Sequence, residues 1–213
     1  MKINATITKK PFMNFKTERK INTFDASLIT ITIVLAAGII AGIIIFIFSK
    51  SIFIKELLDY FIKFSNDLNG KNFIESVSGF MLNNILFALC LIFAGTSSLG
   101  ELVIYPVIFF KSSGLGAIAA YLIKNYRTSG MGYYFLGILP GKIIFIFGLL
   151  FLSQSAIQSS RRIKNSLNFS NKEEINMRLY YARAVMSILI FIASSVIDTT
   201  TIKMFDNFFN LPF

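Results

Sequence analysis

The chain of 213 residues contains no histidine and one cysteine, and only 15% of its residues are charged. Without histidine there is no imidazole to serve as a general base or to bind a metal ion. The single cysteine, Cys90, excludes an internal disulfide, and its place inside an apolar run indicates a small packing residue. Neither an H-E-x-x-H motif nor a G-x-x-x-x-G-K-[ST] phosphate loop is present. The sequence therefore predicts a protein that is not an enzyme and that has no catalytic residues, metal site or cofactor.

Apolar residues are in excess instead: 54% of the chain is hydrophobic and its mean hydropathy is +0.66. Soluble domains are roughly 45–50% apolar and about 25% charged. A folded chain of this size keeps a large surface, so a single soluble core cannot hide the excess. A surface that faces lipid removes the difficulty, which predicts an integral membrane protein with the bilayer as its first partner.

The net charge of +10 has two explanations. A basic protein can bind nucleic acid. Here, however, lysine and arginine lie between long apolar runs, where cytoplasmic loops of a membrane protein place them. This distribution favours a membrane protein with no nucleic-acid partner.

Apolar stretches of about 20 residues are long enough to cross the hydrocarbon core as helices, because the backbone in lipid must satisfy its own hydrogen bonds. The sequence predicts an all-α, polytopic membrane helix bundle of about five transmembrane helices. A basic cytoplasmic tail, residues 1–26, would precede a single membrane domain, residues 27–213. The expected spans are about 28–49, 80–99, 102–122, 134–157 and 184–202.

The third span is interrupted by Lys111-Ser112-Ser113-Gly114 and by Gly116. A lysine in the middle of a span costs about 2.5–3.5 kcal/mol on insertion scales unless it snorkels or finds a partner. We therefore expect a broken or re-entrant segment near residues 111–116, with a straight helix as the alternative. Glu101, the nearest acidic residue, lies about 15 Å away along a continuous helix.

Three other features lie in or near the last two spans. Proline is best tolerated in the first turn of a helix, so we expect a helix to begin near Pro140, after a short lead-in of residues 133–139. Lys142 is, with Lys111, an intramembrane charge of functional interest. Asp198 is expected at the interface rather than as a buried proton carrier, because no second ionisable residue of matched depth is evident.

Small and amide side chains mark candidate helix contacts. Gly38 and Gly42 are four apart, which is either a face for close helix packing or a chance spacing. Asn83 and Asn84 open the second span, where amides contact lipid headgroups or hydrogen-bond across helices.

Basic residues concentrate in the N-terminal tail and in the loop of residues 158–182. With about five crossings these two regions share one side, which the positive-inside rule makes cytoplasmic. Residues 50–79, in which apolar and charged residues alternate at helical spacing, then lie outside as an amphipathic segment. The aromatic C-terminal tail lies outside as well.

The middle of the chain resembles the stage II sporulation protein M family. The likeness rests on the run from Phe80 through Asn83-Asn84, on Phe109-Phe-Lys-Ser-Ser-Gly-Leu-Gly116 and on Gly137-Ile-Leu-Pro-Gly141. By this resemblance the signature positions of structural importance are Asn83, Asn84, Gly95, Gly114, Gly116 and Pro140. Where relatives commonly have Asn-Gly and His-Gly, this chain has Ser113-Gly114 and Gly141-Lys142.

The resemblance implies a multi-pass protein of the mother-cell membrane at the sporulation septum, with its N-terminus in the cytoplasm. It would be a non-catalytic scaffold that anchors and localises two cell-wall-degrading partners, stage II sporulation proteins D and P, during engulfment. A small membrane transporter or channel component is the alternative, because interrupted apolar segments also mark substrate sites. The sequence leaves a homo-oligomer open.

Overall fold

The computed structural model describes residues 18–48, 72–167 and 177–209, and these are almost entirely helical. Residues 1–17, 49–71 and 210–213 lie outside the description, and so do most of the expected amphipathic segment and the end of the aromatic tail. The elements in chain order are α1 (Glu18–Phe48), α3 (Phe73–Gly95), α4 (Gly100–Tyr133), the π-helix η1 (Tyr134–Ile138), α5 (Leu139–Leu167) and α6 (Met177–Phe209).

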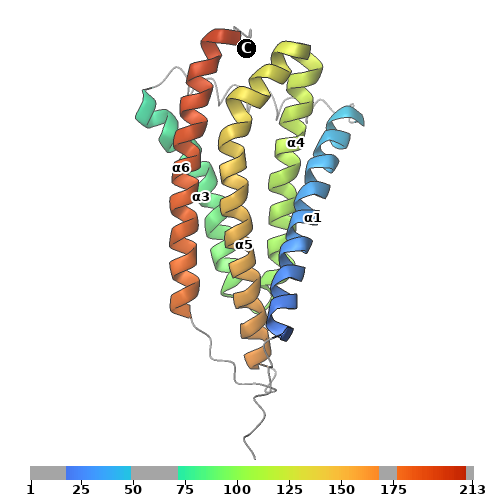
Figure 1. Ribbon diagram of the computed structural model, residues 1–213, viewed down its shortest axis with the longest axis vertical. Helices are drawn as coiled ribbons and strands as arrows, with labels where there is room; N and C mark the ends of the chain where they lie inside the picture. Colours follow the sequence, from blue (N-terminus) through green and yellow to red (C-terminus); the bar gives the residue numbers. More distant parts are fainter. Residues whose placement is uncertain (1–17, 49–71, 168–176, 210–213) are drawn as a thin grey trace, which may run out of the picture.

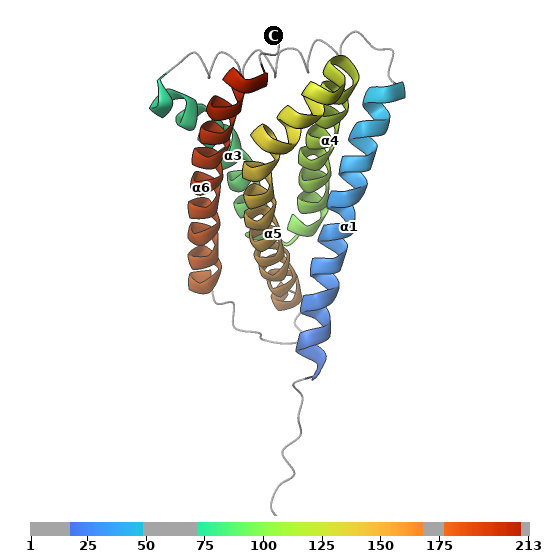
Figure 2. The ribbon, with the colours of Figure 1, turned by 45° about the horizontal axis from the view of Figure 1, so that its top comes forward.

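The long helices lie side by side and alternate in direction, as Figure 1 shows. The start of α1, the end of α5 and the start of α6 lie together at what we call the basic end, since Arg161, Arg162, Lys164 and Arg178 belong to it. The end of α1, the start of α3, the end of α4 and the end of α6 lie at the opposite end, which we call the hairpin end (Figures 1 and 2).

Four helical segments of the described residues are long and apolar enough to cross a membrane: Ala26–Phe48, Phe73–Gly95, Gly100–Leu167 and Met177–Phe205. Large apolar side chains stand exposed on them, among them Leu102 (73%), Phe110 (70%) and Phe147 (65%). Such exposure fits lipid and would be costly in water. The fold is therefore a polytopic membrane helix bundle.

The number of these segments is four, against about five spans expected. The third segment, Gly100–Leu167, is 68 residues long and contains α4, η1 and α5. It doubles back on itself at the hairpin end (Figure 1). Within it the backbone leaves helical geometry at Arg127, and α4 and α5 on either side correspond to the two spans expected at about 102–122 and 134–157.

The expected break at residues 111–116 is wrong, because α4 is helical throughout this stretch. The hydroxyl groups of Ser112 and Ser113 donate to carbonyls one turn back in the same helix, at 2.9 Å each to Ile108 O and Phe110 O. Polar side chains that bond to their own helix need no break in it.

The reversal occurs at Arg127, which has φ 48° and ψ −122°. This left-handed region is ordinary for glycine and strained for a side chain with a Cβ. After the turn, η1 leads into α5, which begins at Leu139 and holds Pro140 in its first turn. A helix was expected to begin near Pro140, but the chain before it is already helical, as the end of α4 and the π-helix η1.

Replacing Arg127 by glycine is expected to raise the free energy of unfolding by about 1–2 kcal/mol, because it removes backbone strain of that order. Glycine at the exposed neighbour Thr128, which is regular helix, should instead lower it by about 1 kcal/mol. Denaturation of both variants by sodium dodecyl sulfate in detergent micelles measures the difference. Equal destabilisation by the two glycines would show that Arg127 is not strained.

Helices α1 and α4 pack closely against each other at three glycines. A Cβ atom on Gly38 would lie 1.9 Å from Ser112 Oγ, and one on Gly42 would lie 1.9 Å from Ser113 O. From the other helix, a Cβ on Gly116 would lie 2.1 Å from Ile39 O. The first of the two readings of the Gly38–Gly42 spacing is thus confirmed: it is a face for close helix packing.

Candidate functional site

A salt bridge joins α5 and α6 inside the bundle. Lys142, in the first turns of α5, donates to Asp198 of α6, with 2.7 Å between Nζ and Oδ2. The Asp198 side chain is fully buried and that of Lys142 is 16% exposed. Charges at such positions in membrane helices are expensive, and they occur where they are paired and often where they have a function.

Glycine makes room for this pair. A Cβ atom on Gly141 would lie 2.1 Å from Asp198 Oδ1, so any larger residue would displace the carboxylate. Two hydroxyl groups of α6 also bind the backbone around the start of α5: Ser194 donates to Gly141 O at 2.9 Å and Thr201 to Gly137 O at 2.6 Å. Gly137 belongs to η1, and π-helical turns are frequent at functional sites.

Lys111 of α4 completes the group. Its ammonium lies 4.0 Å from the centre of the Phe87 ring and 5.1 Å from that of Phe145, so two aromatic faces stabilise it. This ammonium is also close enough to Lys142 and Asp198 to interact electrostatically with both. We call Lys111, Lys142 and Asp198 the buried charge cluster.

The cluster holds two cationic groups and one carboxylate, and only one oxygen of that carboxylate is bonded. Within the described residues, Asp198 Oδ1 has no hydrogen-bond partner. The cluster is thus held in place by helices α4, α5 and α6 but is not fully satisfied. It can fix the relative position of these helices, and it leaves Asp198 Oδ1 as an acceptor with no partner among the described residues.

The structure corrects the expectation for Asp198, which is buried and paired rather than interfacial. Sequence reasoning missed Lys142 as its partner, because 56 positions separate the two. A signal was present: Ser194, Ser195 and Thr199 surround Asp198 on α6, which gives that helix a buried polar face. Glu101, considered as a partner for Lys111, instead pairs with Arg161 at the basic end.

The two asparagines among the expected signature positions differ in burial and in hydrogen bonding. Asn84 is buried in α3 and donates to Ser195 Oγ of α6 at 3.1 Å, whereas Asn83 is only partly buried. Both lie about three turns inside α3, which begins earlier than expected, at Phe73. Of the two roles considered for these amides, Asn84 takes the bond across helices.

Of the glycines among the signature positions, two lie in helix contacts and one is exposed. A Cβ on Gly95 would meet Tyr180 Oη at 2.2 Å and Ala156 Cα at 2.9 Å, so this glycine lies in a helix contact, as Gly116 does. Gly114 is exposed and would have no atom within 4 Å of an added Cβ. Pro140 is partly buried in the first turn of α5.

Replacing Asn84 by alanine is expected to lower the free energy of unfolding by about 1 kcal/mol, the usual contribution of a hydrogen bond between membrane helices. The same change at Asn83 should cost less, because its side chain is partly exposed. Denaturation in micelles checks both variants. A larger loss at Asn83 than at Asn84 would contradict the assigned bond.

No group of three or more potential ligands from histidine, cysteine, aspartate and glutamate gathers among the described residues in a way that could hold a metal ion. What the site offers is electrostatic: a buried carboxylate between two ammonium groups, bordered by aromatic rings. This arrangement can lock helices together or attract a small ion.

Comparison with known proteins gives one match. The family model of stage II sporulation protein M matches residues 31–200, which contain part or all of each helix of the bundle and the whole buried charge cluster. No curated protein and no solved structure matches the chain. With its membrane-spanning helices and this match over most of its length, the chain belongs to the stage II sporulation protein M family.

Proposed function

We propose that this protein is a non-catalytic membrane scaffold of endospore formation, which anchors and localises stage II sporulation proteins D and P during engulfment. The observation that carries the proposal is the family match over residues 31–200. The proposal includes a place in the mother-cell membrane at the septum, with the N-terminus in the cytoplasm.

The positive charge of the basic end supports this orientation. Arg161, Arg162, Lys164 and Arg178 lie at the basic end, together with the start of α1. Cytoplasmic ends of membrane helices carry such an excess of lysine and arginine. The hairpin end then faces the cell wall, which is the side where cell-wall-degrading partners act.

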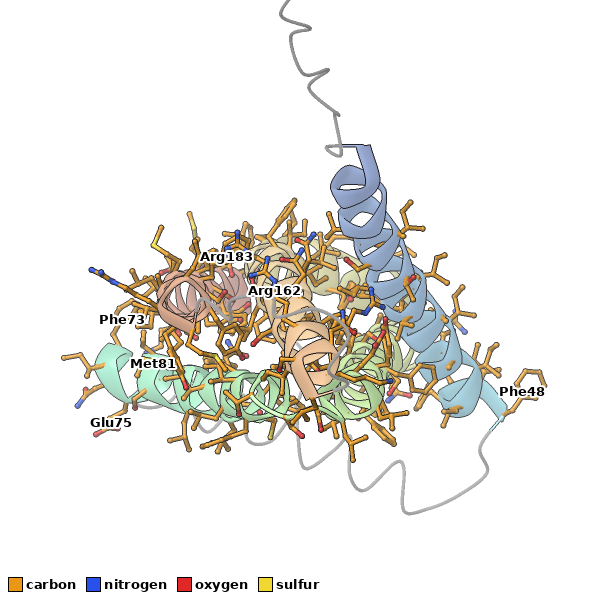
Figure 3. The ribbon with its side chains drawn as sticks, turned by 90° about the horizontal axis from the view of Figure 1, so that it is seen from below. Phe48, Phe73, Glu75, Met81, Arg162 and Arg183 are labelled. Atoms are coloured by element: carbon orange, nitrogen blue, oxygen red, sulfur yellow. The ribbon has the colours of Figure 1, made fainter. Side chains whose placement is uncertain are left out.

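The hairpin end also has a surface for a partner. In Figures 1 and 2 the first turns of α3 extend away from the bundle. Phe73 is 47% exposed and Ile74 is 79% exposed there, next to the exposed carboxylate of Glu75. Figure 3 shows Phe48, Phe73 and Glu75 at the outer edge of the molecule. Residues 49–71, which lie outside the described residues, join Phe48 to the start of α3 in the sequence.

The test replaces residues 50–71 by a glycine–serine linker of equal length in a sporulating strain. Fluorescent stage II sporulation proteins D and P are expected to leave the septum, and engulfment to stop. The matched control replaces residues 2–17, which precede α1 in the sequence, and should keep both proteins in place. An immunoblot confirms equal amounts of each variant. Normal recruitment with the linker would reject this docking surface.

A small transporter or channel component remains the second candidate, because the buried charge cluster is of a kind found on ion pathways. A deletion strain separates the two functions. Arrested engulfment with normal solute uptake supports the scaffold, whereas normal engulfment with altered uptake supports transport.

A further inference from the structure

A second polar site lies at the basic end, between α5 and α6, outside the buried charge cluster. It is a cavity of about 20 Å³ lined by Ser155, Gln158, Ser159, Arg162, Leu179, Tyr180 and Arg183. Figure 3 looks onto this end and shows Arg162 and Arg183 close together over the bundle. We call it the arginine pocket.

Apart from Leu179, the described residues that line the arginine pocket carry hydrogen-bond donors, and none of them is a carboxylate. Ser159 is only 6% exposed, and its hydroxyl group has no hydrogen-bond partner within the described residues. Arg183 donates to Gln158 Oε1 at 3.4 Å, which leaves the amide NH₂ of Gln158 as a further donor. The other two hydroxyl groups are already used, since Ser155 donates to Phe151 O and Tyr180 to Ile92 O.

Neither arginine of the pocket forms a salt bridge with a described residue, although Arg161 beside them pairs with Glu101. Two guanidinium groups with no salt bridge to a described residue, a buried hydroxyl group with no partner among those residues, and an amide thus converge on one cavity. A guanidinium group can donate two parallel hydrogen bonds to two oxygens of one phosphate. A phosphate presents several acceptor oxygens and no obligatory donor.

The size of the cavity specifies how such a group would enter. A volume of about 20 Å³ holds one water-sized group. One phosphate oxygen therefore fits inside, against Ser159, while the remaining oxygens stay outside between the two guanidinium groups.

The surroundings indicate where the phosphate comes from. Leu179 borders the pocket and is 43% exposed, and Val185 (57%), Met186 (59%) and Leu189 (56%) continue an exposed apolar surface along α6. This surface belongs to a segment that can cross the membrane. A lipid whose phosphate lies in the pocket would have its acyl chains along this surface.

We propose that the arginine pocket binds the phosphate group of an anionic lipid from the leaflet at the basic end. Phosphate supplied in solution would satisfy the same donors, so the test includes it as a separate arm. The site depends on neither the scaffold nor the transport proposal, since all of its groups lie outside the buried charge cluster and the hairpin end.

The experiment uses the full chain in detergent micelles, titrated with phosphatidylglycerol, with phosphatidylcholine or with inorganic phosphate, and detects bound molecules by native mass spectrometry. Phosphatidylglycerol is expected to be retained by the unaltered protein. R162Q and R183Q should each weaken its binding about tenfold or more, as expected for loss of a charged hydrogen bond. R178Q, which removes an exposed charge outside the pocket on the same helix, is the control and should change binding less than threefold.

Ser159→Val provides a test without a change of charge, since it fills the cavity and removes the donor. Loss of phosphatidylglycerol binding in this variant, with the size-exclusion profile unchanged, supports the site. Retention of inorganic phosphate but not of phosphatidylglycerol, sensitive to the same three variants, supports the site and rejects the lipid as its source. Equal weakening by R162Q, R183Q and R178Q, or unaltered binding in Ser159→Val, overturns the proposal.

Discussion

Replacing Asp198 by asparagine is expected to lower the free energy of unfolding by about 3–5 kcal/mol, the usual cost of removing one partner from a buried ion pair. Asp198 is the carboxylate that faces both Lys142 and Lys111. Its loss leaves two ammonium groups inside the bundle with aromatic rings as their remaining stabilisation. Denaturation by sodium dodecyl sulfate in micelles, followed by circular dichroism, measures the change.

Lys142→Met should cost less than Asp198→Asn, because Asp198 keeps the attraction of Lys111 when Lys142 is lost. The double variant should cost less than the sum of the two single changes, since it removes both members of the pair together. The matched control is Glu101→Gln. It breaks the Glu101–Arg161 pair, whose side chains are 33% and 42% exposed, and should cost about 1 kcal/mol or less.

Additive effects of Asp198→Asn and Lys142→Met would contradict a coupled buried pair. The same variants also separate stability from function. If the cluster only locks the helices, engulfment should fail in proportion to the loss of folded protein. If it carries an ion, Lys111→Met should alter solute uptake while the protein remains folded.

The sequence predicted the class of this fold because apolar runs of sufficient length have few alternatives to membrane helices. It placed a reversal between the expected spans 102–122 and 134–157 but did not identify Arg127 as the residue where the backbone turns. An arginine carries no signal for a left-handed backbone, and glycines nearby, such as Gly130, suggested an ordinary loop. The break expected near Lys111 failed for a different reason, since aromatic rings from α3 and α5 stabilise the lysine within a continuous helix.

The sequence predicted the two lysines of the buried charge cluster but not its carboxylate. Lys111 and Lys142 stood out as charges in apolar stretches, but the depth of each along its helix depends on where the helices begin and how they pack. Asp198 was assigned to the interface because α6 was expected to end near residue 202, whereas it continues to Phe209. The seven further residues place Asp198 inside the bundle, at the level of Lys142.

Alanine at Gly42 or at Gly116 is expected to lower the free energy of unfolding by about 1–3 kcal/mol, as overpacking does in a tight interface. The new methyl group would meet the backbone of the other helix, at Ser113 O or Ile39 O, and a backbone cannot rotate away as a side chain can. The contact must therefore open, and α1 must move from α4 along its whole length.

Gly114 is the matched control because it lies in the same helix as Gly116, two positions away. A Cβ there has no atom within 4 Å, so alanine at Gly114 should be neutral or should stabilise by up to about 1 kcal/mol through its helix propensity. Denaturation in micelles compares the three variants. Because only the position on the helix differs between Gly114 and Gly116, a loss shared by both would show that propensity or insertion, and not the α1–α4 contact, decides the effect.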